Sequence, residues 1–330
     1  MNNPLLIFND RGIYCEQADV YLDPWKPVDK AIISHGHADH SRWGHQHYIM
    51  HYDTIPIAKH RLGDIHVSGV EYGESFSING VKFSLHPAGH VIGSAMIRVE
   101  YQGEVWVFSG DYKDEPDGVS EPFQPVKCNT FITECTFGLP SFKWKPQDEV
   151  VQEINQWWKK NRGDGRTSVL FVYALGKAQR VMKYLDTSIG DVYTHGAIEN
   201  LTEVLRPLID LPETTKITRD TKKEDLKGNM VIAPPSAHGT SWIKKMVPYV
   251  TASASGWMTF RGTRRRRAID QGFVLSDHCD WDGLLYSIKE SQCERVICTH
   301  GYSDIFSRYL TDIGYDGRTA QTQYETNDAI

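Results

Sequence analysis

Short apolar runs separated by glycines and polar turns dominate the first part of the chain, residues 1–139. The runs are four to eight residues long and either alternate with polar positions or are apolar throughout, which is typical of strands. They are AIIS, VKFSLH, SAMIRVEY, VWVFSG and TFITEC. We therefore predict that this part consists mostly of β-sheet.

The pattern changes to a helical period at about residue 140. Apolar residues of QDEVVQEINQWWKKN recur on one helical face and predict a helix of about four turns. These residues are Val150, Val151, Ile154, Trp157 and Trp158. TSVLFVYALGKAQRVMKYL then predicts a strand that runs into a helix, and DVYTHG, MVIAPPSA and YVTASASG predict further strands. This alternation indicates a parallel α/β layer over residues 140–271.

In the last part, residues 272–330, the sequence predicts the order strand, turn and helix two times.

With 330 residues, 40% of them hydrophobic, the chain can bury the core of one large domain or of two. Its apolar runs are too short to span a bilayer, and MNNPLLIFND lacks the basic start of a signal peptide, so we expect a cytoplasmic protein with no membrane contact. The six cysteines form no C-x-x-C pair and are expected to be buried, reduced thiols.

The formal net charge of −6 argues against a polyanionic partner, but positive charge is concentrated locally. FRGTRRRRAID contains Arg261 and the run 264–267, and WWKKNRGDGR forms a second basic cluster. Each cluster is consistent with a solvated face or with a phosphate-binding surface.

The segment AIISHGHADH places three histidines and an aspartate directly after an apolar run. Residues that follow a strand lie at the carboxyl end of the sheet, where His35, His37 and Asp39 can project toward one point with His40 beside them. Imidazole and carboxylate groups suit Zn, Mn or Fe. Because burying four polar groups without a ligand would be costly, this density favours a metal site over core packing.

Three further candidate ligands each follow a predicted strand: His90 in HPAGHVIGSA, Asp111 in VWVFSGDYK and His300 in RVICTHGYS. Singly, such residues are also common in turns and caps. Together they complete two groups, in which one ion is held by His35, His37 and His90 and the other by Asp39, His40 and His300. Asp111 would bridge them, since two ions about 3.5–4 Å apart can clamp both oxygens of a phosphodiester displacement.

This H-x-H-x-D-H string with downstream His, Asp and His resembles the signature of the metallo-β-lactamase fold. On that resemblance, Asp23 in VYLDPW matches the early aspartate that orders the site behind the ligands, although it also reads as a turn residue before Pro24. Small-substrate members such as β-lactamases and glyoxalase II-type thioesterases share the signature, so it does not by itself name the substrate.

Further motifs resemble the β-CASP branch of this superfamily, which processes nucleic acids. They are TECTFG with Glu134, LSDHCDWDGL with His278 and ICTHG with His300. The resemblance implies an αββα sandwich formed by residues 1–139 and 272–330, with a β-CASP α/β cap inserted at residues 140–271. It also implies that Glu134 orients His278, which acts as general acid on the leaving group near neutral pH.

LFVYALGKAQRVMKYL, VYTHGAIENL, VIAPPSA and the stretch from SASGWMTF to LSDHCDW resemble bacterial ligase-associated DNA exonucleases, relatives of Artemis-type repair nucleases. The likeness covers essentially the whole chain. One departure is His300, because Artemis-type enzymes generally lack this histidine and RNA-processing members have it.

Weaker motifs suggest contacts with nucleic acid. GKAQR opens a predicted helix, where Lys177 could hold a phosphate, and SASG could form an anion nest from Ser253 and Ser255 beside the arginine run. Plain turn chemistry explains both motifs equally well. The basic residues expected to grip phosphates are Arg261, Arg264 and Arg265.

The sequence thus predicts a DNA exonuclease of a repair pathway that uses two divalent ions, Zn or Mn. Its expected partners are DNA that is single-stranded or has ends, together with a DNA ligase and a helicase. The alternatives are an RNA-processing β-CASP ribonuclease and a metal-bound scaffold in a repair complex.

Overall fold

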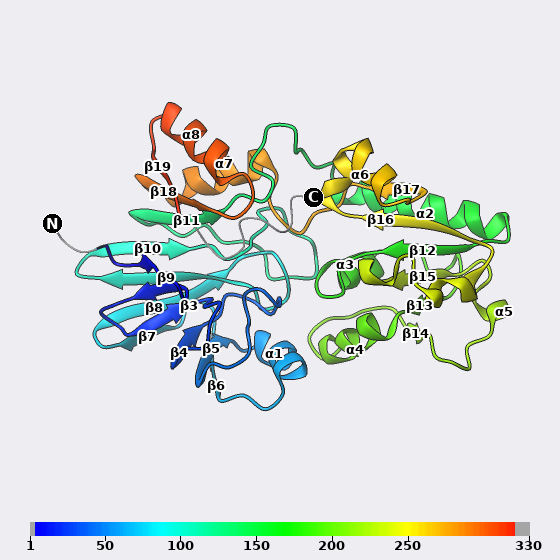
Figure 1. Ribbon diagram of the computed structural model, residues 1–330, viewed down its shortest axis with the longest axis horizontal. Helices are drawn as coiled ribbons and strands as arrows, with labels where there is room; N and C mark the ends of the chain where they lie inside the picture. The colour runs from blue at the N-terminus through cyan, green and yellow to red at the C-terminus, as the bar shows by residue number, and fades with distance from the viewer. Residues whose placement is uncertain (1–3, 321–330) are drawn as a thin grey trace. The chain divides into compact units, whose positions relative to one another are not determined.

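The computed structural model describes residues 4–320, which belong to two compact units (Figure 1). The first unit is formed by the chain up to Lys143 and from His278 onward, and the second is Trp144–Asp277. The second unit begins and ends a few residues later than the change of pattern in the sequence, which lies at residues 140 and 271.

The first sheet of the first unit has six strands in chain order and is antiparallel from β1 to β3 and parallel from β3 to β6. Its strands are β1 (Ile7–Phe8), β2 (Ile13–Cys15), β3 (Val20–Leu22), β4 (Lys30–Ile32), β5 (His47–His51) and β6 (Val67–Val70). Helix α1 (Thr54–Leu62) packs on its outer face, where Ala58 joins Ala31, Ile33 and Met50 in one apolar cluster.

The second sheet of this unit has seven strands in the order β19-β18-β11-β10-β9-β8-β7. It comprises β7 (Ser75–Ile78), β8 (Val81–Pro87), β9 (Ala95–Tyr101), β10 (Glu104–Phe108), β11 (Thr130–Glu134), β18 (Arg295–Thr299) and β19 (Asp316–Thr319). The strands β10, β11, β18 and β19 are parallel. Helices α7 (Trp281–Ser291) and α8 (Ser303–Asp312) pack on its outer face, where Leu284 and Phe306 contact the sheet.

The main core of this unit lies between its two sheets. Leu22 and Ile32 of the first sheet pack there against Phe83, Ile97 and other apolar side chains of the second. The layers therefore follow the order helix, sheet, sheet, helix, with α1 at one side and α7 and α8 at the other (Figure 1).

The second unit is built on a parallel sheet in the order β14-β13-β15-β12-β16-β17. Its strands are β12 (Thr167–Phe171), β13 (Val192–Thr194), β14 (Thr215–Lys216), β15 (Met230–Ala233), β16 (Tyr249–Ala254) and β17 (Gln271–Phe273). One face is covered by α2 (Gln147–Gly163), α3 (Lys177–Lys183) and α4 (Gly196–Leu205), and the other by α5 (Lys223–Leu226) and the 3-10 turns η1 (Pro235–Ala237) and η2 (Ser241–Met246). The turn η3 (Gly256–Thr259) and helix α6 (Arg261–Arg266) follow β16.

The strands and the long helix expected from the apolar pattern are confirmed. VKFSLH, VWVFSG and TFITEC correspond to β8, β10 and β11, and QDEVVQEINQWWKKN lies in α2, which buries Val150, Ile154 and Trp158. All six cysteines are free and buried, as their scattered positions predicted. Within residues 4–320, no helix has both the length and the apolar character needed to cross a bilayer.

Candidate metal centre and acid

The candidate site lies where strands of the first unit end. Because β3 and β4 are parallel, and β10, β11 and β18 are parallel, the residues that follow them meet at one edge of each sheet. Asp23 follows β3, the HGHADH segment follows β4, His90 follows β8, Asp111 follows β10, Glu134 ends β11 and His300 follows β18. Topology therefore gathers residues that are far apart in the sequence.

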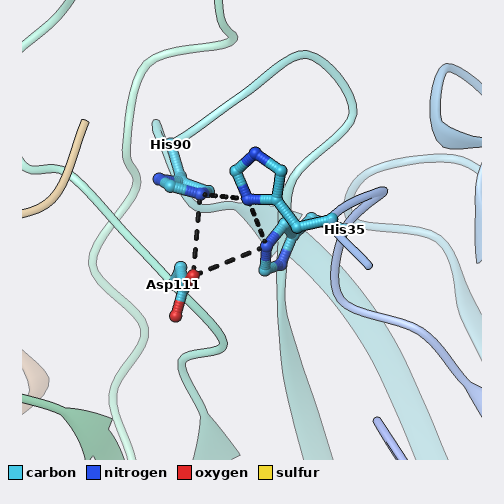
Figure 2. A group of neighbouring side chains, drawn as sticks. His35, His90 and Asp111 are labelled. Carbon is cyan, nitrogen blue, oxygen red and sulfur yellow. Dashed lines mark hydrogen bonds and ion pairs between the residues drawn. The ribbon is translucent and has the colours of Figure 1, made fainter. Parts of the chain in front are cut away.

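Three imidazoles and one carboxylate converge in a first group (Figure 2). The Nδ1 atom of His37 lies 3.0 Å from Nε2 of His35 and 3.0 Å from Nε2 of His90. Oδ2 of Asp111 lies 3.5 Å from Nε2 of His35 and 3.7 Å from Nε2 of His90. The four ligand atoms all lie within 4.8 Å of one another.

The spacing and charge of this group fit a zinc-like ion. Tetrahedral bonds of about 2.0–2.1 Å to nitrogen would set neighbouring ligand atoms about 3.3 Å apart. Burial, reinforced by the charge of neighbouring His40, holds the pKa of His35 well below its ordinary value. His35 is therefore neutral, which is the form of imidazole that binds a metal.

A second group is centred on His40. Its Nε2 atom lies 3.5 Å from Oδ1 of Asp111 and 3.7 Å from Oδ2 of Asp39, and its ring centroid lies 6.0 Å from that of His300. Asp111 thus turns one oxygen toward each group, which is the arrangement expected of a bridging carboxylate.

The charges around His40 favour a cation at this position. Burial opposes protonation of His40, but the carboxylates of Asp111, Asp39 and Asp23 outweigh it and raise its pKa well above the ordinary value. Burial likewise opposes ionisation of Asp111, yet His40 and His278 lower the pKa of Asp111 well below its usual range. A divalent ion would satisfy the same carboxylates that here stabilise a proton.

Asp23 holds the ligand segment from behind. Its Oδ2 atom lies 2.6 Å from Nδ1 of His40, and its Oδ1 atom accepts the backbone N–H of Ser34 at 2.7 Å. The hydroxyl of Ser34 donates to the same carboxylate and lies 3.0 Å from Nδ1 of His35. This network orients the rings of His35 and His40, which is how outer residues tune metal ligands.

Two residues of the candidate site, Asp23 and His300, have unusual backbone conformations. Asp23 has φ of 40° and His300 has φ of 57°, a region that residues other than glycine seldom adopt. Such conformations cluster at functional sites, because the surrounding structure must hold them.

Glu134 and His278 form a third feature beside the two groups of candidate ligands. Nδ1 of His278 lies 2.8 Å from Oε1 of Glu134, while Oε2 of Glu134 accepts the backbone N–H of Thr136 at 2.9 Å. The rings of His278 and His90 lie 4.7 Å apart. Glu134 is buried, so the carboxylate that contacts His278 is fixed on both oxygens.

The residues expected to contact nucleic acid lie in the second unit. Lys177 is buried, with Nζ 3.2 Å from Oδ2 of Asp277, and Ser253 is a buried residue of β16. Ser255 caps η3 by accepting the backbone N–H of Trp257 at 3.3 Å. As phosphate contacts, these residues remain predictions.

The predicted arginine contacts share one helix. Arg261, Arg264 and Arg265 all belong to α6, where Arg261 and Arg265 are exposed and Arg264 is half-buried. Their contact with nucleic acid also remains a prediction.

Sequence reasoning missed Ser34 and Arg61. Nη1 of Arg61, on α1, donates to the carbonyl oxygens of Gly36 at 2.8 Å and Ser41 at 3.3 Å. These hydrogen bonds stabilise the segment that contains His37, Asp39 and His40. The position of Ser34, directly before His35, was a signal that could have been used. Arg61 offered none, since its partners are backbone atoms.

The chain is similar in sequence to several named proteins, and no family model matches it. It is 28% identical to the "Probable DNA ligase" of Opitutus terrae over 310 residues, which cover 92% of this chain and 30% of that protein. It is 34% identical to the "Endoribonuclease YSH1" of Saccharomyces cerevisiae over 122 residues, which cover 36% of this chain and 15% of that protein. The chain therefore spans less than a third of the length of either relative.

A solved structure shares the fold. The "Protein of Unknown Function from Enterococcus faecalis V583" superposes with a TM-score of 0.59 at 11% identity, over 90% of this chain and 80% of that one. This match supports a mixed α/β fold. The similarity in sequence to these proteins supports a relationship to the β-CASP branch of the metallo-β-lactamase superfamily.

Proposed function

We propose that the chain is a divalent-metal-dependent DNA exonuclease of the cytoplasm that hydrolyses phosphodiester bonds. Its catalytic unit would be an αββα metallo-β-lactamase core, and residues 140–271 would form the β-CASP cap. The observation that carries the proposal is the position of Asp111. Its Oδ2 atom faces His35 and His90 and its Oδ1 atom faces His40, while His278, held by Glu134, lies beside His90.

Two ions, zinc or manganese, would be held by these two groups, with Asp111 shared between them. His35, His37 and His90 would hold the first ion, and Asp39, His40 and His300 the second. When bound, they would supply Lewis acidity toward the phosphate and activate a water molecule for attack.

The chain's own residues would donate the proton to the leaving group and orient the ligands and the attacking water. Glu134 fixes Nδ1 of His278, so Nε2 would be the atom that gives a proton to the departing oxygen of the phosphodiester. Asp23 keeps Nδ1 of His40 engaged and leaves Nε2 directed toward Asp111. The side chain of Asp39 is 44% exposed, so Asp39 can meet solvent and would help to orient the attacking water.

DNA is the substrate that we favour, because the relative matched over 92% of this chain is named as a probable DNA ligase. A DNA ligase and a helicase of a repair pathway would then act on the same ends. The basic residues of α6 would bind phosphates despite the net charge of −6.

An RNA-processing ribonuclease is the second candidate. It is favoured by His300, which Artemis-type DNA nucleases generally lack, and by the similarity to the YSH1 endoribonuclease. A metal-bound scaffold is less consistent with a histidine and glutamate pair placed beside the ligands.

The deciding experiment is digestion of a linear single-stranded DNA, its circular form and an RNA of the same sequence, each with Zn or Mn. We expect degradation of the linear DNA and little attack on the circle or the RNA. Faster cleavage of RNA would support the ribonuclease, equal attack on the circle would exclude a pure exonuclease, and no cleavage of any substrate would overturn the proposal.

A further inference from the structure

A buried ion cluster immediately precedes His278 in the chain. Lys177 and Arg180, both on α3, each form an ion pair with one oxygen of the Asp277 carboxylate. Lys177 Nζ lies 3.2 Å from Oδ2, and Arg180 Nη1 lies 3.1 Å from Oδ1. All three residues are at most 5% exposed. Each of these interactions lies within the second unit.

Arg180 also binds the backbone at the same place. Its Nη1 atom donates to the carbonyl oxygen of Ser276 at 2.6 Å, and its Nε atom donates to the side chain of Gln147. Thus α3 holds both the main chain of Ser276 and the side chain of Asp277.

The chain is anchored after His278 as well. The backbone N–H of Cys279 donates to the carbonyl oxygen of Tyr112 at 3.0 Å, within the first unit. The residues on either side of His278 are thus each held by contacts within their own unit, and the imidazole of His278 lies 2.8 Å from the carboxylate of Glu134. A general acid needs this kind of fixed orientation, because a displacement of about 1 Å can cost 10²-fold in rate.

We infer that Lys177 and Arg180 are positioning residues for His278, acting through Asp277. This inference rests on the proposed function, in which His278 is the general acid. It also gives Lys177 a role different from the phosphate contact expected from GKAQR, because its ammonium group is buried against Asp277.

The two roles of Lys177 predict different kinetics. If Lys177 binds a phosphate of the substrate, Lys177→Met should raise KM and reduce the salt dependence, with kcat unchanged. If Lys177 is a positioning residue, the same change should lower kcat by about 10- to 100-fold and leave KM and the salt dependence unchanged. Lys177→Arg, which keeps the cation, should then restore most of kcat.

The experiment compares kcat, KM and salt dependence for the wild type, Lys177→Met, Lys177→Arg and Asp277→Asn. Lys183→Met is the matched control, since Lys183 is an exposed lysine of the same helix. We expect Lys177→Met and Asp277→Asn to lower kcat alike, and the double variant to be no slower than either. A raised KM with unchanged kcat, or no difference from Lys183→Met, would overturn the inference.

Hydrogen exchange provides a readout that does not depend on catalysis. In Lys177→Met and Asp277→Asn, but not in Lys183→Met, the backbone amides of residues 276–279 should exchange faster, because these variants remove the ion pairs that hold the segment. Unchanged exchange would overturn the inference even if the wild type proved to be an active nuclease. Absence of cleavage by the wild type, together with faster exchange in the variants, would instead overturn the proposed function and leave only the anchoring of the segment.

Discussion

The imidazole of His278 lies 2.8 Å from the carboxylate of Glu134, although the two residues are 144 positions apart in the chain. Glu134 ends β11, which is a central strand of the second sheet, so its position is set by the core of the first unit. A carboxylate fixed in this way can hold one nitrogen of the imidazole and direct the other toward a substrate.

His278→Ala should lower kcat for phosphodiester cleavage by about 10² to 10⁴-fold, the usual contribution of a general acid. The content of bound metal should not change, because His278 is not among the residues assigned to the two ions. Glu134→Gln should have the same effect in milder form. Kinetics and elemental analysis on the same preparations test this, and loss of metal together with activity would make His278 a ligand.

Asp23→Asn should weaken metal binding by about 10- to 100-fold, because Asp23 orients His40 and is not among the residues assigned to the two ions. Zinc titration followed by elemental analysis is the measurement, and the wild type should hold two ions. Asp10→Asn is the control, since Asp10 forms an exposed ion pair with Lys26 at 3.0 Å. Equal metal affinity in Asp23→Asn and Asp10→Asn would remove Asp23 from the site.

Stability should fall at acidic pH partly because of His45. Burial lowers the pKa of His45 to about 4, and neither ring nitrogen has a hydrogen-bond partner among residues 4–320. The unfolded chain, with an ordinary pKa near 6.5, therefore binds more protons than the folded chain between about pH 6.5 and 4. The contribution to stability is thus present above pH 6.5 and is lost as the pH falls toward 4.

His45→Gln does not titrate, so it should lose about 2 kcal/mol less of its unfolding free energy than the wild type between pH 7 and pH 4. Urea unfolding at several pH values measures the difference. His60→Gln, at an exposed position of α1, is the control and should follow the wild type. Parallel curves for the wild type and His45→Gln would show that His45 titrates normally in the fold.

The convergence of the candidate ligands could be predicted from the local sequence better than the hydrogen-bond network around them. HGHADH concentrates four polar groups at one strand end, and His90, Asp111 and His300 each follow a clear apolar run, so their convergence follows from parallel topology. The contact of Arg180 with Asp277 spans 97 positions and has no local signature, because it depends on how α3 packs in the second unit. Strands such as β1 and β14, with two residues each, are too short to show the alternation of apolar and polar residues from which a strand is predicted.

Neutralising the arginines of α6 should weaken the binding of single-stranded DNA and flatten its salt dependence. Each phosphate contact contributes about −0.7 to the slope of log K against log salt, so the triple change of Arg261, Arg264 and Arg265 to Gln should reduce the slope by up to about 2. Fluorescence anisotropy with a labelled oligonucleotide at several salt concentrations measures this. The control changes the exposed lysines 222, 223 and 227 to Gln, which alters the net charge equally. If both triple variants lower the slope by the same amount, the effect comes from net charge, and α6 is not a specific phosphate-binding surface.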